Sequence, residues 1–180
     1  MKFIYFTALS FALSGCWSGT NFYALSEGVA AIPAGEYEAI YTYDNQAAED
    51  ESPFGRKLTV KYAKDGHAEV ANFEGDVSSN STLIKLGSEP GLYVVQAELG
   101  APIPKIGSAV YGLVELLPAG YRVAIPKCDQ RRLEQWDRAI VSGLLVGKPF
   151  CRFSNREGFE QAMLQYAKDP IGWTEYRRIK

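Results

Sequence analysis

The chain contains one histidine, His67, which limits the chemistry that its side chains can perform. A nucleophilic triad needs a histidine close to both a nucleophile and an orienting acid. His67 follows the turn-forming pair Asp65-Gly66, and strand alternation puts it in phase with Glu69 on a solvent-facing side. The sequence has no Gly-x-Ser-x-Gly elbow, no His-Glu-x-x-His pair and no glycine-rich phosphate loop. We therefore expect no catalytic residue.

Three carboxylates near one predicted strand end, Glu69, Glu74 and Asp76, are the remaining acid–base candidates. Paired carboxylates hydrolyse glycosidic bonds, so an envelope carbohydrate hydrolase stays an alternative. Carboxylates also gather in solvated loops, as they do in residues 44–51. A zinc site is poorly supported, because one histidine and no Cys-x-x-Cys spacing are available. The sequence predicts neither a metal nor a cofactor.

Cys16 ends a segment with the composition of a secretory signal. Met1-Lys2 gives a positive start, residues 3–12 are apolar, and small residues precede the cysteine. The apolar run is too short to span a membrane, which takes about twenty residues. The sequence Leu13-Ser14-Gly15-Cys16 resembles the lipobox of bacterial lipoproteins. In these proteins the cysteine is diacylated through its thiol, and after cleavage of the signal peptide this residue is the new N-terminus.

This resemblance implies a signal peptide over residues 1–15 and a membrane partner reached through the lipid on Cys16. Two or more acyl chains hold a protein stably, whereas one holds it only marginally. Trp17, not aspartate, follows the cysteine, which favours the periplasmic face of the outer membrane over the inner membrane. The resemblance covers only this segment. We expect a lipidated tether over residues 16–33 and one globular β-rich domain over residues 34–180.

Cys128 and Cys151 form an even pair in a chain predicted to be exported. Disulfides persist in oxidising compartments, so we predict that these two residues are bridged. Two buried free thiols are the alternative.

Alternating apolar and polar residues predict an antiparallel β meander. The clearest strand has Leu58, Val60 and Tyr62 alternating with lysine and threonine. Residues 108–117 are apolar on both faces, which predicts a strand that is central or covered. About seven or eight short strands joined by Gly, Pro and Asp turns are typical of a barrel or a sandwich. The spacing does not choose between these two closures.

Two helices are predicted in the C-terminal half, which makes the fold class α+β. The first covers residues 129–141, and the second follows Ser154, whose spacing to Glu157 matches a capping box. Because each cysteine precedes one of these helices, the bridge is expected to join the two helix starts. The apolar stripes consist of Leu133, Trp136 and Ile140 in the first helix and of Phe159, Met163 and Tyr166 in the second.

Two groups of apolar residues are candidates for contact with a partner. Tyr37, Tyr41 and Tyr43 share a strand face, which is either a recognition surface or a covered sheet face. Ile103 and Ile106 lie in a proline-stiffened loop that either contacts a partner or folds back onto the domain.

Composition and inventory together favour a non-catalytic binding or structural module of the cell envelope. An apolar share of 47% is typical of a packed domain, and a net charge of −2 argues against a generally basic nucleic-acid binder. The alternative is a carrier of a small apolar ligand or lipid in a β-barrel interior. That interior would be lined by Tyr93, Val95, Val110, Val114 and Val123.

Overall fold

The computed structural model describes residues 17–40, 57–64, 68–72, 77–103, 107–128, 140–145 and 148–180. These residues form one sheet of eleven strands, one short 3-10 helix, η1 (Leu25–Glu27), and one α-helix, α3 (Arg156–Tyr166). The strands are β1 (Trp17–Gly19), β2 (Gly35–Ile40), β3 (Lys57–Tyr62), β4 (Ala68–Asn72), β5 (Val77–Lys85), β6 (Leu92–Ile103), β7 (Gly107–Leu117), β8 (Gly120–Ala124), β9 (Ile140–Leu145), β10 (Lys148–Phe153) and β11 (Trp173–Arg178).

Strands β2 to β8 follow one another as an antiparallel meander, and β11 pairs with both β8 and β2. Strand β6 also pairs along β7, so every strand of this set has two hydrogen-bonded neighbours. Strands β1, β10 and β9 extend the sheet from β7. The predicted β-rich α+β class is confirmed.

Strand β7 separates two apolar cores, because its side chains alternate between the two faces of the sheet. Tyr111 and Leu113 belong to one core and Val114 to the other, which confirms the predicted covered strand. The helix-side core consists of Trp17, Tyr23, Ile84, Leu86, Val94, Ala109, Tyr111, Leu113, Ala124, Cys128, Cys151, Phe153, Phe159, Ala162, Met163 and Tyr166. The tyrosine core consists of Ile32, Tyr37, Ala39, Leu58, Val60, Leu83, Val114, Tyr121, Val123 and Tyr176.

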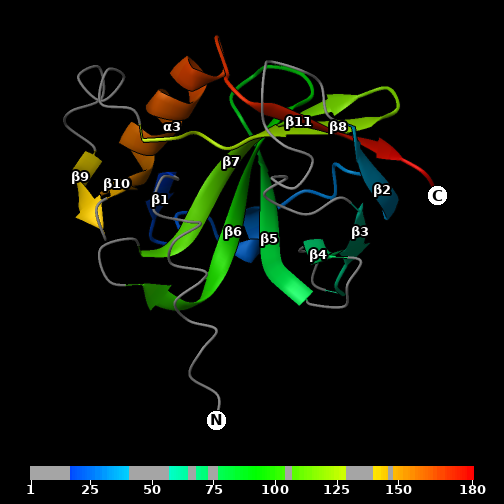
Figure 1. The fold of residues 1–180 in the computed structure, drawn as a ribbon, viewed down its shortest axis with the longest axis horizontal. Helices are drawn as coiled ribbons and strands as arrows, with labels where there is room; N and C mark the ends of the chain where they lie inside the picture. The colour runs from blue at the N-terminus through cyan, green and yellow to red at the C-terminus, as the bar shows by residue number, and fades with distance from the viewer. Residues whose placement is uncertain are drawn as a thin grey trace.

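Helix α3 covers the helix-side core and lies beside β1 and β10, on the opposite side of the molecule from β2, β3 and β4 (Figure 1). Asn155 caps its first turn, since the Asn155 Oδ1 atom accepts a hydrogen bond of 2.8 Å from the backbone N–H of Gly158. The predicted cap was Ser154, one residue too early. Both side chains can cap a helix, and only the backbone geometry decides between them. The predicted stripe of Phe159, Met163 and Tyr166 is confirmed as buried.

The prediction of two helices is wrong for the part of the chain that the structure describes, which contains the single α-helix α3. Residues 129–139 of the predicted first helix lie outside the described residues. Its last two residues, Ile140 and Val141, begin strand β9, which pairs with β10 in antiparallel register. Both side chains are β-branched, and such residues favour strands once a pairing partner is present.

The described part of the predicted tether, residues 17–33, belongs to the folded domain. Trp17–Gly19 forms β1, which pairs with β7 on one side and in parallel with β10 on the other. Gly107 lets β7 approach β1 closely, since its φ is +115° and a Cβ atom there would meet the Gly19 carbonyl oxygen. Trp17 is only 1% exposed, so this segment is held by packing rather than left free in solvent.

Candidate functional site

Three tyrosines from three neighbouring strands stack together in the tyrosine core. Tyr121 of β8 lies opposite Tyr176 of β11 in the strand register, and their ring centroids are 5.3 Å apart. Tyr37 of β2 meets the Tyr121 ring edge-on at 5.0 Å. All three side chains are buried. Edge-on and offset-stacked aromatic pairs are favourable beyond the area that they bury, so this cluster rigidifies the junction of the three strands.

Two tyrosine hydroxyls of this region tie the segment before β2 to the sheet. The Tyr37 hydroxyl donates to the Pro33 carbonyl oxygen at 2.6 Å, and the Tyr62 hydroxyl donates to the Ile32 carbonyl oxygen at 2.6 Å. The Tyr121 hydroxyl has no hydrogen bond to any of the described residues. Because rings from three strands meet here, we take this cluster as the candidate binding site.

Burial is the main cause that raises the pKa of Tyr121 above its ordinary value, and the neighbouring tyrosines Tyr176, Tyr37 and Tyr62 raise it further. The pKa values of Tyr37 and Tyr62 are also raised, again mainly by burial. The folded state therefore favours the neutral hydroxyls. Their contribution to stability is complete below the ordinary pKa of 10.0 and is lost as the pH rises above it.

Alkaline unfolding checks this arrangement. As the pH rises past the ordinary tyrosine value of 10.0, we expect the chain to lose its circular dichroism as the buried tyrosines ionise. Tyrosinate absorbance and circular dichroism should change together for these residues. Tyr121→Phe keeps the ring and removes the ionisable hydroxyl, so it should move the transition to higher pH. Complete tyrosinate formation in a chain that keeps its circular dichroism would contradict the burial of the cluster.

The residues predicted to line a carrier interior are mostly brought together. Val114 and Val123 are in the tyrosine core, and Tyr93 and Val95 pack against it. Val110 is half-buried and lies between Ala97 and Ser18 in the strand register.

The predicted partner contacts are only partly within the described residues. Tyr37 is fully buried, so its side chain is not part of an exposed recognition surface; β2 pairs with β3 and β11, and its tyrosine face packs into the core. Ile103 ends β6 opposite Gly107. Tyr41, Tyr43 and Ile106 lie outside the described residues.

The acid–base and metal candidates are also incompletely described. Glu69 lies opposite Lys61 in the register of β4 and β3, whereas His67, Glu74 and Asp76 fall outside the described residues. Among the described residues, no group of three His, Cys, Asp or Glu side chains could hold a metal ion. None of the described helices combines the length and hydropathy that crossing a bilayer requires.

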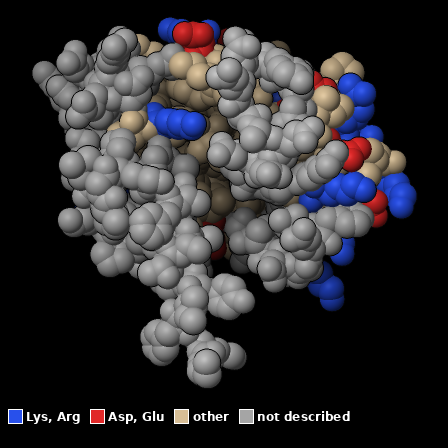
Figure 2. Space-filling model, in the orientation of Figure 1, with Lys and Arg blue, Asp and Glu red and all other residues tan. Residues whose placement is uncertain are grey.

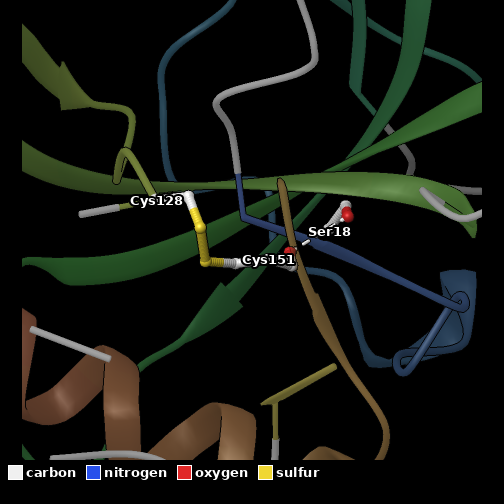
Figure 3. The surroundings of a disulfide bond; sticks show 3 residues. All are labelled: Ser18, Cys128 and Cys151. Carbon is white, nitrogen blue, oxygen red and sulfur yellow. Dashed lines mark hydrogen bonds between the residues drawn. A yellow bond between two sulfur atoms is a disulfide. The ribbon is translucent and has the colours of Figure 1, made fainter. Parts of the chain in front are cut away.

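The predicted disulfide between Cys128 and Cys151 is present, with the two Cα atoms 5.5 Å apart. It joins the segment after β8 to the middle of β10, and the Ser18 hydroxyl of β1 donates to the Cys151 carbonyl oxygen at 3.1 Å (Figure 3). The bridge was expected to join two helix starts. Cys151 instead lies within β10, where it pairs with Trp17 of β1, so the bridge fixes the added strands to the meander.

Removal of this bridge with Cys128→Ala and Cys151→Ala should lower the free energy of unfolding by about 3 kcal/mol. The bridge closes a loop with a sequence separation of 23, which reduces the entropy of the unfolded chain. Denaturant unfolding of the wild-type chain with and without reductant should give the same difference. Equal stability of all forms would show that the bridge does not restrict the unfolded chain.

A buried amide that the sequence analysis missed holds the N-terminal segment against β6. The Gln96 side chain is fully buried, accepts a hydrogen bond from the Tyr23 N–H at 3.2 Å and donates to the Tyr23 carbonyl oxygen at 3.0 Å. A buried polar group is costly unless it is hydrogen-bonded, so a glutamine inside the apolar run of residues 93–97 was the available signal.

Several charged side chains of the described surface pair with one another. Arg156 contacts Glu27 at 2.7 Å and Glu160 at 2.8 Å, and its guanidinium lies over the Tyr23 ring at 4.4 Å. Hydrogen bonds to these two carboxylates raise the Arg156 pKa above its ordinary value. Residues of both signs also stand side by side over β2 and the C-terminal end of the chain (Figure 2). Such exposed pairs contribute little to stability and neutralise one another's charge.

Comparison of the chain with protein-family models, with curated proteins and with solved structures finds no match.

Proposed function

We propose that this chain is a lipid-anchored protein of the bacterial envelope, acylated on Cys16, whose domain binds another envelope component without catalysing a reaction. The segment Leu13-Ser14-Gly15-Cys16 supports the anchor through its resemblance to a lipobox. The residue that follows the cysteine favours the periplasmic face of the outer membrane.

The burial of Trp17 is the observation that carries this proposal. Trp17 is 1% exposed and begins β1, one residue after the cysteine that the resemblance makes the new N-terminus. Cleavage before Cys16 would therefore keep every described residue of β1 and of the helix-side core. Trp17, the second residue of the mature chain that the resemblance implies, is already part of the packed domain, which supports a mature chain that begins at Cys16.

Pairing of the charged residues supports a binding role over a catalytic one. Arg122 contacts Glu115 at 2.5 Å on the outside of β7 and β8, and its guanidinium lies over the Trp173 ring at 4.4 Å. An acid–base site needs a titratable group with a shifted pKa that is aimed at a reacting atom. The Glu115 carboxylate is instead held by Arg122, whose guanidinium in turn packs on Trp173, so this pair is committed to structure.

Membrane fractionation of cells that express the full chain tests the anchor. The wild-type protein should be found in the membrane fraction, and Cys16→Ser should not be acylated there. Gly15→Ala is the matched control, because it keeps a small residue before the cysteine and should leave the protein acylated and membrane-bound. Acyl label on Cys16→Ser equal to that on the wild-type protein would overturn the proposed anchor.

A carrier of a small apolar molecule is the second candidate. The pairing of β6 with β7 supports a barrel of eight strands, β2 to β8 and β11, over a sandwich. A barrel of this size has an interior that side chains just fill or that holds one small ligand. The Tyr121 hydroxyl, which has no hydrogen bond among the described residues, supports a ligand with one polar group.

Mass spectrometry under native conditions distinguishes the carrier from a module with a filled interior. The wild-type protein would keep the additional non-covalent mass of one small molecule, and Val95→Trp would lose it, since Val95 packs against the tyrosine core. Lys61→Trp, at an exposed position of β3, is the control and would keep that mass. A wild-type protein without any additional mass would argue against the carrier.

A further inference from the structure

We propose that the end of the fold at which β1 begins rests directly on an anionic phospholipid bilayer, through an anchor face formed by Lys127, Lys168 and Ile171. This inference depends on the proposed acylation of Cys16. It adds the orientation of the domain and the chemistry of the surface that it contacts.

The anchor face follows first from the short distance between Cys16 and the core. The Trp17 backbone N–H donates to the Pro126 carbonyl oxygen at 3.2 Å, so the start of β1 is fixed to the segment after β8. Consecutive Cα atoms are about 3.8 Å apart. The residue that follows Cys16 in the sequence is therefore held beside Pro126, so no free tether follows it that could carry the domain away from the lipid headgroups.

Ile171 is fixed to the same end of the fold by the tyrosine that packs on Trp17. The rings of Trp17 and Tyr166 have centroids 5.6 Å apart. The Tyr166 hydroxyl donates to the Ile171 carbonyl oxygen at 2.9 Å and accepts from the Ile171 N–H at 3.3 Å. Strands β11 and β8 are antiparallel, and Trp173 pairs with Ala124. Ile171, which precedes Trp173, therefore lies toward the same end as Pro126, which follows Ala124.

The exposed side chains of this end have the chemistry of a membrane surface contact. Ile171 is 61% exposed, the highest value among the large apolar residues of the described chain. Lys127, which follows Pro126, and Lys168, three residues before Ile171, are both exposed, and Asp169 is the acid that follows Lys168. Apolar side chains that enter the headgroup boundary, together with lysines that attract anionic lipid, are the features of proteins that lie on a membrane.

A bilayer fits this face better than a protein partner does, because of the anchor. A partner would have to enter the space between the domain and the membrane, and a buried residue directly after Cys16 leaves little such space. Ile179, which is 43% exposed, provides an internal comparison. It lies beyond the other end of β11, whose six residues extend for about 17 Å at the rise of a strand.

Photo-crosslinking of the full acylated protein tests the orientation. The variants are Ile171→p-benzoylphenylalanine and Ile179→p-benzoylphenylalanine, each reconstituted in vesicles of phosphatidylethanolamine and phosphatidylglycerol. After irradiation, we expect the adduct with phospholipid to be several-fold more abundant at position 171 than at position 179. Equal adducts at the two positions, or more at 179, would overturn the anchor face.

The intact mass of each variant before irradiation separates the two proposals. A chain without acyl groups would overturn the proposed anchor and the anchor face together. An acylated chain without preferential crosslinking at position 171 would overturn the anchor face alone.

Charge reversal tests the lipid chemistry in the same vesicles. Lys127→Glu combined with Lys168→Glu should reduce the adduct at position 171 several-fold. Lys61→Glu combined with Lys64→Glu is the matched control, because these two lysines lie toward the end of the fold that contains Lys180. Val60 of β3 pairs with Gly35, and the N–H of the next residue, Glu36, donates to the Lys180 carbonyl oxygen. If both double variants reduce the adduct equally, the lysines of the anchor face do not select anionic lipid.

Discussion

We expect Trp17→Ala to lower the free energy of unfolding by about 3 to 5 kcal/mol, as large-to-small substitutions of buried aromatic residues do. The Trp17 ring is almost fully buried and packs against two other rings. Its centroid lies 4.9 Å from that of Phe153 and 5.6 Å from that of Tyr166. Its removal leaves a cavity between β10 and α3 that these rings cannot fill without leaving their present positions. Denaturant unfolding of the purified chain measures the difference.

A matched control distinguishes a packed residue from a residue of a free tether. Val29→Ala lies in the same N-terminal segment, but Val29 is 40% exposed, so the change in stability should be small. If Trp17→Ala is as stable as Val29→Ala, then residues 17–19 are a tether and the anchor face loses its basis.

The second large effect is expected for Phe159→Ala, which should also cost about 3 to 5 kcal/mol. Phe159 is fully buried in the helix-side core, where the centroid of its ring lies 4.3 Å from that of Tyr111 and 5.2 Å from that of Phe153. The substitution removes contacts that join α3 to β7 and to β10. Leu164→Ala on the same helix is the control, because Leu164 is 38% exposed and alanine favours a helix.

Thermal or denaturant unfolding followed by circular dichroism gives both values for α3. A loss at Phe159 no larger than that at Leu164 would mean that the helix does not pack on the sheet as described. Two variants on one helix share its intrinsic propensity, so the difference between them reports packing.

Alternation of residue types was sufficient to predict the strands of the meander. Leu58, Val60 and Tyr62 share a face of β3, and the apolar strand β7 is covered on both faces. A strand that buries one or both faces must carry this pattern in its own residues, so it can be recognised locally.

Elements fixed by distant partners could not be predicted from their own residues. Strand β1 has three residues, too few for any periodicity, and its hydrogen bond from Ser18 to Cys151 spans 133 residues. Strand β9 begins with Ile140, which also fits the predicted helical stripe, and the pairing of β9 with β10 decided the outcome.

The candidate site was only partly visible in the sequence for a similar reason. Tyr37 was noted for its strand face, but its ring contact with Tyr121 and the stacking of Tyr121 on Tyr176 depend on the order of β2, β11 and β8. The last strand of the chain enters between two earlier ones, which no local pattern indicates. In contrast, Val114, Val123, Tyr93 and Val95 could be grouped from the sequence, because the residues of each strand show which of its faces is apolar.

The mass of the protein extracted from its own membrane with mild detergent tests the central claim most directly. We predict a chain that begins at Cys16, carries covalent acyl groups on that residue and retains the disulfide between Cys128 and Cys151. A chain of unmodified mass, or one that retains residues 1–15, would contradict the proposed anchor and the membrane orientation that depends on it.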